Sequence, residues 1–270
     1  MITAVVTIAT AVALAVGLTG KSASGQTRLT AEVTDAKPAL TVPKGWKLTF
    51  DAGFAGSKLN TKVWATCYWW SPKGCTNNPT LEREWYLPSQ VSVRGGVLHL
   101  VAQHKKTAGQ DSNGKPKSYT CRSGMVTSAP GFNFKYGIVQ IVARIPYGTG
   151  LWPGLWLAAS NHQWPPEIDI MEHWHSDPQA KVYVHPVVGH YFGGPVPTPG
   201  NLSKGWHSFR LYWTKNRITW YIDGVQVYTE TKYVPQQDMY LVADLADDST
   251  AANSCTGTML IQSVKVWQPA

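Results

Sequence analysis

From Trp46 onward the chain alternates short β-rich runs with turn signals, and this pattern constrains the fold more than any other feature. Two alternating stretches flank Gly95-Gly96, which is a strong hairpin signature. Two turn pairs divide residues 207–230 into three strand-like segments and predict a meander. No segment shows a sustained helical period. The sequence therefore predicts an all-β fold, a sandwich of two antiparallel sheets with a concave face.

The first twenty residues carry no charge and are rich in Ala, Val, Ile and Leu, which is typical of a secretory signal peptide. Because no Lys or Arg precedes this run, an uncleaved anchor is the alternative. We expect residues 1–23 to be a cleaved signal peptide, giving a secreted protein with no stable membrane insertion. Residues 24–44 lack periodicity and are predicted to be a linker or extended N-terminal arm. Residues 45–270 suffice for one large β-domain.

The net charge of +8 is spread along the chain rather than clustered, so nucleic acid is not an expected partner. Thirteen tryptophans stand against only six phenylalanines. Trp combines a flat apolar face with a polar edge, which suits stacking against sugar rings, although a Trp can equally fill a core. A neutral or weakly anionic polymer is compatible with this composition, and we expect the protein to be a monomer.

Four cysteines, Cys67, Cys75, Cys121 and Cys255, favour two disulfides over metal ligation in an exported chain, because no CxxC pair is present. Three pairings are possible. The short loop between Cys67 and Cys75 contains a Pro and a Gly, which makes this pair the local favourite and leaves Cys121 for Cys255.

Three acids lie close together in WPPEIDIMEHW, residues 164–174. On a regular strand Glu167 and Asp169 share one face, and Glu172 points to the other. A β-bulge near Ile170-Met171 brings all three to one face. Like charges on one face destabilise a strand, so a chemical role explains them better than a structural one. Glycoside hydrolysis needs two carboxyls that flank the glycosidic bond. These carboxyls are about 5–5.5 Å apart in enzymes that retain the anomeric configuration.

The segment EIDIME resembles the ExDxxE signature of glycoside hydrolase family 16, the laminarinase, agarase and carrageenase group. The resemblance extends over most of residues 46–268. It implies a β-jelly-roll with a concave cleft, in which Glu167 is the nucleophile, Glu172 the general acid/base and Asp169 an assisting residue. The spacing is similar to that of the laminarinase branch, which favours β-1,3-glucan as the substrate. Galactan-cleaving members share this spacing.

Departures from the family pattern point to an atypical sugar specificity. Pro166 stands where the family commonly has Gly, and Met125 where an Arg often follows an SG pair. LADDSTAANSC, residues 245–255, replaces a glycine-rich segment. Many members carry a structural calcium held by an Asp of the last strand, where this chain has Ser263, so neither a metal nor any other cofactor is expected.

Aromatic side chains around the acids are candidates for sugar binding. Trp164 matches a family position that contacts substrate, and His185 matches the histidine that follows the motif. For Trp152, Trp156 and Trp174 core packing is the alternative. His173 and His175 alternate away from the acidic face and do not predict a zinc site.

Three other functions compete with hydrolysis of β-glucan. A non-catalytic carbohydrate-binding protein can use the same sandwich, but it would need neither glutamate. A galactan hydrolase and a transglycosylase would use the same carboxylates. The sequence therefore predicts a secreted retaining endo-glycosidase acting on a β-linked polysaccharide.

Overall fold

The computed structural model describes residues 41–69, 75–78, 80–248, 250 and 255–270. The expected signal peptide, and the expected arm up to residue 40, lie outside these residues. The described residues belong to one compact unit, Asp35–Ala270. Within them, no helix is long and apolar enough to cross a membrane.

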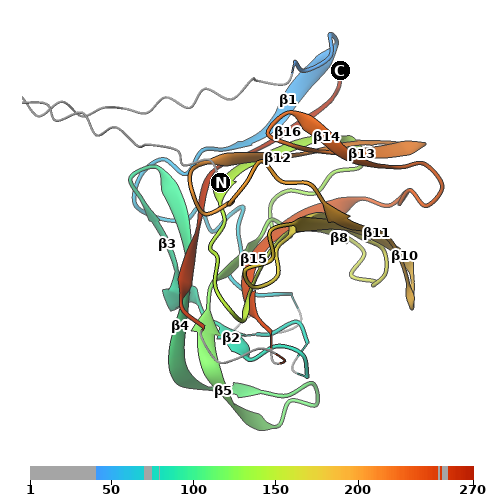
Figure 1. Ribbon diagram of the computed structural model, residues 1–270. Helices are drawn as coiled ribbons and strands as arrows, with labels where there is room; N and C mark the ends of the chain where they lie inside the picture. Colours follow the sequence, from blue (N-terminus) through green and yellow to red (C-terminus); the bar gives the residue numbers. More distant parts are fainter. Residues whose placement is uncertain (1–40, 70–74, 79, 249, 251–254) are drawn as a thin grey trace, which may run out of the picture. The chain divides into compact units, whose positions relative to one another are not determined.

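Two sheets make up the described part of the chain (Figure 1). The larger sheet has ten strands: β1 (Trp46–Ala52), β2 (Glu84–Tyr86), β3 (Val91–Arg94), β4 (Val97–Gln110), β5 (Pro116–Ser123), β7 (Gly137–Arg144), β12 (His207–Thr214), β13 (Arg217–Ile222), β14 (Val225–Glu230) and β16 (Gly257–Pro269). The smaller sheet has six: β6 (Met125–Thr127), β8 (Leu151–Ala159), β9 (Glu167–Glu172), β10 (Ala180–Val187), β11 (His190–Val196) and β15 (Met239–Asp247). A short 3₁₀ turn, η1 (Pro88–Gln90), precedes β3.

Strand order confirms the predicted jelly-roll sandwich. The smaller sheet runs β11-β10-β9-β8-β15-β6, and all of its pairings are antiparallel. In the larger sheet β2 pairs in parallel with β5, while its other pairs are antiparallel. Figure 1 shows β12, β13 and β14 in one layer, facing a second layer that contains β8, β10 and β11.

The expected turns form where the sequence predicts them. Gly95 and Gly96 have φ values of 59° and 75° and join β3 to β4, because a two-residue hairpin loop of this kind needs positive φ at both central residues. Residues 207–230 form the antiparallel meander β12-β13-β14.

The alternation of side chains along each strand separates a core face from a second face. Apolar residues of the smaller sheet pack against the larger sheet in one buried core that includes Leu155, Leu157, Ile168, Val184 and Leu241. The intervening residues of β8 and β15, among them Trp156 and Val242, belong to a separate apolar cluster on the opposite face. The smaller sheet is thus covered on one face and carries its polar and aromatic residues on the other.

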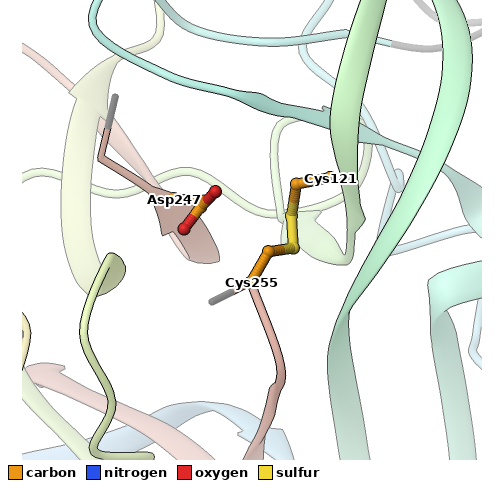
Figure 2. A group of neighbouring side chains, drawn as sticks. All are labelled: Cys121, Asp247 and Cys255. Atoms are coloured by element: carbon orange, nitrogen blue, oxygen red, sulfur yellow. A yellow bond between two sulfur atoms is a disulfide. The ribbon is translucent and has the colours of Figure 1, made fainter. Parts of the chain in front are cut away.

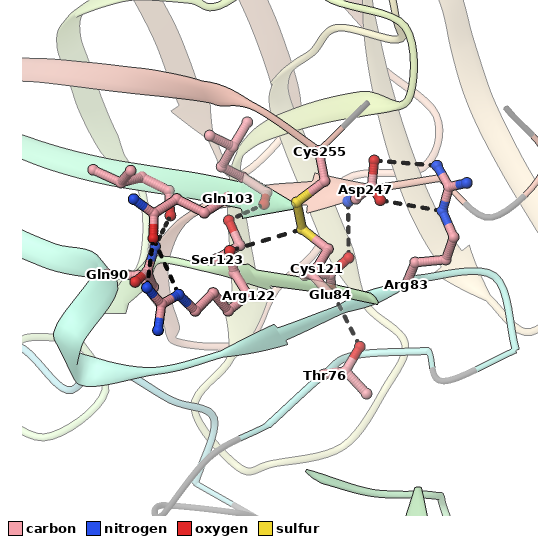
Figure 3. The surroundings of a disulfide bond; sticks show 12 residues. Thr76, Arg83, Glu84, Gln90, Gln103, Cys121, Arg122, Ser123, Asp247 and Cys255 are labelled. Carbon is pink, nitrogen blue, oxygen red and sulfur yellow. Dashed lines mark hydrogen bonds and ion pairs between the residues drawn. A yellow bond between two sulfur atoms is a disulfide. The ribbon is translucent and has the colours of Figure 1, made fainter. Parts of the chain in front are cut away.

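Two disulfides join Cys67 to Cys75 and Cys121 to Cys255, each with a Cα–Cα distance of 5.8 Å. This is the connectivity that the short Cys67 to Cys75 loop favours. Figure 3 shows the second bridge beside Asp247, which forms an ion pair with Arg83 and whose backbone N–H donates to Glu84 at 2.8 Å. The bridge therefore ties β5 to the segment that leads into β16, at the end of β15.

Candidate active site

The three acids of the motif lie on one face of β9 because the strand contains a bulge. Met171 pairs with Leu155 and Asp169 pairs with Trp156, so three residues of β9 match two of β8 and Ile170 is the extra one. The same offset appears against β10. Ile170 and Met171 are both buried in the core. The bulge restores the common face of Glu167, Asp169 and Glu172.

A hydrogen bond from the other sheet supports the bulge. The indole N–H of Trp220, in β13, donates to the backbone carbonyl of Asp169 at 2.8 Å. Trp220 is buried, and its bond crosses the core. The carbonyl next to the extra residue is thereby satisfied, which matters because an unpaired buried carbonyl is costly.

A cavity of about 530 Å³ lies over this face of the smaller sheet. Its lining combines the three acids with aromatic and polar side chains: Asn77, Asn78, Leu81, Glu82, Trp152, Gly154, Trp156, Trp164, Glu167, Asp169, Glu172, Trp174, Tyr183, His185, Tyr191, Asp244 and Ala246. Within the described part of the chain, the lining contains no Lys or Arg. The cavity therefore suits a neutral ligand with flat apolar faces and many hydroxyl groups.

Glu167 is held by two neighbours at the cavity wall. The indole N–H of Trp164 donates to Oε2 at 2.9 Å, and Nε2 of His185 lies 3.6 Å from Oε1. Burial raises the pKa of Glu167 well above its usual range, and the charge of Asp169 raises it further. His185 and the Trp164 hydrogen bond act in the opposite direction.

Glu172 has its own indole donor. Nε1 of Trp152 donates to Oε1 of Glu172 at 2.8 Å, and the ring of Trp152 packs edge-on against Trp174 at 5.2 Å. Burial raises the pKa of Glu172, whereas the Trp152 hydrogen bond and the charges of His185 and Lys181 lower it. Each glutamate therefore has a separate tryptophan that stabilises its charged form.

Asp169 lies between the glutamates and contacts His185. Its Oδ2 is 3.0 Å from Nε2 of His185. Burial raises the pKa of Asp169 well above its usual range, Glu172 adds to the rise, and a hydrogen bond with Glu167 opposes it. Three buried carboxyls this close cannot all ionise freely, so the group retains protons at a pH where isolated acids would have lost them.

The structure places all five predicted sugar-binding residues at the cavity, in different settings. Trp164 is 57% exposed and offers a free ring face, while Trp156 is 8% exposed and forms part of the floor. Trp152, Trp174 and His185 are partly buried in the wall. His173 is fully buried and stacks on Tyr147, and His175 lies 3.3 Å from Asp248, so neither faces the acids.

Sequence reasoning missed several residues of the cavity. Tyr183 shares the parity of His185 on β10, which is a signal that could have identified it. Asp244 stands as an acid inside the apolar run of β15, a second usable signal. Asn77 and Asn78 come from a loop, and no pattern in the sequence points to them.

Among the described residues, two groups of side chains bring possible ligand atoms close enough together to hold a metal ion. Cys121, Asp247 and Cys255 form one of them, but Figure 2 shows the two sulfurs bonded to each other. Because the thiolate is the metal ligand, a disulfide removes both sulfur donors. Glu167, Asp169 and His185 form the other group and are the carboxylate cluster already described.

A jelly roll whose smaller sheet carries two glutamates in an aromatic-lined cavity has the features of a glycoside hydrolase. The chain belongs to the glycosyl hydrolases family 16, whose family model matches residues 88–262.

Individual relatives agree with this family. The endo-1,3-1,4-beta-glycanase EglC of Rhizobium meliloti (strain 1021) is 30% identical over 219 residues, which are 76% of this chain and 46% of that protein. A beta-1,3-glucan-binding protein of Penaeus monodon is 27% identical over 38% of this chain and 33% of its own. The chain spans about half the length of the curated relatives it matches, 42% to 54% of the first three.

Solved structures show the same fold. The catalytic domain of an endo-1,3-beta-glucanase (laminarinase) from Thermotoga petrophila RKU-1 superposes with a TM-score of 0.71 at 23% identity, over 83% of this chain and 98% of that chain. At this level of identity the likeness establishes the architecture but not the substrate, which has to be inferred from the residues of the site.

Proposed function

We propose that this protein is a retaining endo-glycosidase that hydrolyses a β-linked glucan, with β-1,3-glucan as the preferred substrate. One observation carries the proposal: two glutamates on a bulged strand line the same cavity, and each accepts a hydrogen bond from its own tryptophan. A protein that only binds glycans would not need both acids on one face.

Glu167 is the proposed nucleophile and Glu172 the proposed general acid/base, in the order that the family resemblance gives. The Glu167 carboxylate attacks the anomeric carbon while Glu172 donates a proton to the departing sugar oxygen. Glu172 then takes a proton from water, whose oxygen attacks the same carbon and releases Glu167. Asp169 and His185 position Glu167 and help set how the three carboxyls share their protons.

The lining of the cavity supports a neutral substrate. Sulfate and uronate groups are usually held by Arg or Lys, and the described lining residues include neither. Exposed Trp164 and Tyr191 offer ring faces on which pyranose rings can stack. A β-glucan therefore fits better than a sulfated galactan, and transglycosylation remains the second candidate because it shares the glycosyl-enzyme.

We also propose that residues 1–23 are a signal peptide, residues 24–44 an arm, residues 45–270 the catalytic domain, and the mature protein extracellular. The two disulfides support this, because such bridges form and persist in oxidising compartments.

The test is a screen of purified protein against laminarin, lichenan, agarose and chitin, with reducing ends and product sizes as the readout. We expect oligosaccharides of mixed length from laminarin. Glu167→Gln and Glu172→Gln serve as controls and should each lower turnover by about 10²–10⁴-fold or more, with unchanged circular dichroism. Laminarin that stays intact while agarose is cleaved would refute the glucan assignment. Near-normal turnover in either variant would refute the site.

A further inference from the structure

Asp244 lies in one row with Gly154 and Glu172 across three neighbouring strands. Asp244 of β15 pairs with Gly154 of β8, and Gly154 pairs with Glu172 of β9. Strands are about 4.8 Å apart, so the backbones of Asp244 and Glu172 are roughly 10 Å apart on the same face. All three residues line the cavity. Asp244 and Glu172 therefore face the same cavity from strands two apart in the sheet.

Gly154, which has no side chain, leaves room for the Asp244 carboxyl in the floor between the two acids. A Cβ at this position would lie 2.7 Å from Oδ1 of Asp244, so any larger residue would collide with that oxygen. Oδ1 therefore extends over the glycine, on the side that faces Glu172. A ligand that enters the cavity at Gly154 meets this oxygen.

The other oxygen of Asp244 already has two donors. Oδ2 accepts hydrogen bonds from the Tyr68 hydroxyl at 3.1 Å and from Nε1 of Trp156 at 3.0 Å. No hydrogen bond to Oδ1 is found among the described residues. If the carboxyl carries a proton, it is therefore on Oδ1, because both acceptor positions of Oδ2 are occupied.

The surroundings of Asp244 favour its neutral form. Burial raises its pKa to about 8, with a further contribution from Glu82 and a small one from Glu172, and these outweigh the hydrogen bonds of Trp156 and Tyr68. Asp169 interacts with it from β9, and Tyr86 from β2. The charged groups that act on Asp244 are thus carboxyls, and they disfavour a further negative charge.

We propose that Asp244 is a specificity-determining residue that binds substrate as a neutral carboxylic acid, with its Oδ1 hydrogen donated to a sugar hydroxyl above Gly154. This inference rests on the proposed function for the identity of the ligand. Asn is the isostere of the protonated acid, since its amide NH₂ can replace the Oδ1 donor and its carbonyl can accept from Tyr68 and Trp156. An ionised Asp244 has lost the donor.

Binding is measured without turnover in the Glu167→Gln protein, with a soluble β-1,3-gluco-oligosaccharide of six units as the probe. Calorimetry gives Kd at pH 6 and at pH 9.5, with and without Asp244→Asn. Other carboxyls titrate in both proteins, so the ratio of their Kd values isolates Asp244. We expect equal Kd values at pH 6. At pH 9.5 the protein that retains Asp244 should bind about tenfold more weakly than the Asn variant, as expected for loss of one hydrogen bond to a polar ligand.

Asp247→Asn is the matched control, because Asp247 is a buried acid of the same strand that does not line the cavity. The ratio of the Kd values with and without Asp247→Asn should be the same at pH 6 and at pH 9.5. A second variant, Asp244→Leu, should weaken binding at both pH values. Weak binding by the Asn variant at pH 6, or a ratio that does not change with pH, would overturn the proposal. Failure of the wild-type protein to cleave glucan would refute the proposed function separately, since the Kd values do not depend on cleavage.

Discussion

The indole N–H of Trp164 donates a 2.9 Å hydrogen bond to Oε2 of Glu167. This bond lowers the pKa of a carboxyl that burial raises, so it helps to keep the proposed nucleophile ionised. The same ring is 57% exposed and offers a face to the substrate. One side chain can therefore contribute to both binding and charge.

Trp164→Phe is expected to move the acidic limb of the kcat/KM profile to higher pH. Phe keeps a ring for stacking but has no donor, so the pKa of Glu167 rises and the nucleophile ionises later. Activity on the acidic side should fall by about tenfold, as for a lost hydrogen bond to a charged group. Initial rates on laminarin between pH 4 and pH 9 measure this. An unshifted acidic limb would contradict the role of the indole.

Trp152→Phe is the paired variant and should act on the other limb. In the unmodified protein the indole N–H of Trp152 donates to Glu172 at 2.8 Å and lowers the pKa of that carboxyl. Without the bond the proposed acid keeps its proton to higher pH, and the alkaline limb should move upward. The same rate measurements report it. If both tryptophan variants shift the same limb, the roles of the two glutamates are not separate as proposed.

The bulge and the acidic face could be predicted because their cause is local. Three acids in six residues share a face only if one extra residue corrects the parity, and the register of β9 places that residue at Ile170. The hairpin at Gly95-Gly96 was predictable for the same reason: two adjacent residues determine it.

The acid in the apolar run of β15 marks Asp244 in the sequence, but its contacts could not be predicted, because its partners are distant in sequence. Tyr68 is 176 positions away, and Trp156 is 88 away. Trp156 meets Asp244 because β15 pairs directly with β8, although β9 to β14 lie between these two strands in the sequence, and no local pattern specifies this pairing. The close approach of Asp244 to Gly154 depends on that same pairing.

The disulfides are expected to contribute unequally to stability. The Cys121–Cys255 bridge spans 134 residues and the Cys67–Cys75 bridge spans 8. The loop-entropy relation gives about 5 kcal/mol for the first and about 2.5 kcal/mol for the second. Chemical denaturation of the two double Cys→Ala variants tests this. Equal losses, or free thiols at any of these positions in non-reducing peptide maps, would contradict the expectation.

Asp244→Asn should stabilise the protein increasingly as the pH rises from about 4 to about 8. The native Asp244 keeps its proton up to a pKa of about 8, while the unfolded chain loses it near 3.8, so wild-type stability falls across this window and levels off above it. The Asn variant has no such loss. The difference in Tm, about 2–4 °C for each kcal/mol, should therefore grow up to pH 8.

Asp247→Asn provides the comparison for this series. The pKa of Asp247 is raised to about 6, so the difference in Tm between Asp247→Asn and the wild-type protein should stop growing near pH 6. Loss of the Arg83 ion pair adds a constant offset to this difference. A Tm difference for Asp244→Asn that is the same at pH 4 and pH 8 would mean that Asp244 is ionised in the native protein throughout.

In the proposed mechanism Glu167 attacks the anomeric carbon directly, and Glu172 protonates the departing sugar oxygen. Two displacements at one carbon restore its configuration, whereas a single attack by water inverts it. Proton NMR of the first products from a β-glucan, recorded before mutarotation, distinguishes the two. We predict that the β-anomer appears first. Initial release of the α-anomer would rule out Glu167 as the nucleophile, because inversion requires that a water, activated by a carboxylate further from the sugar, attacks the anomeric carbon.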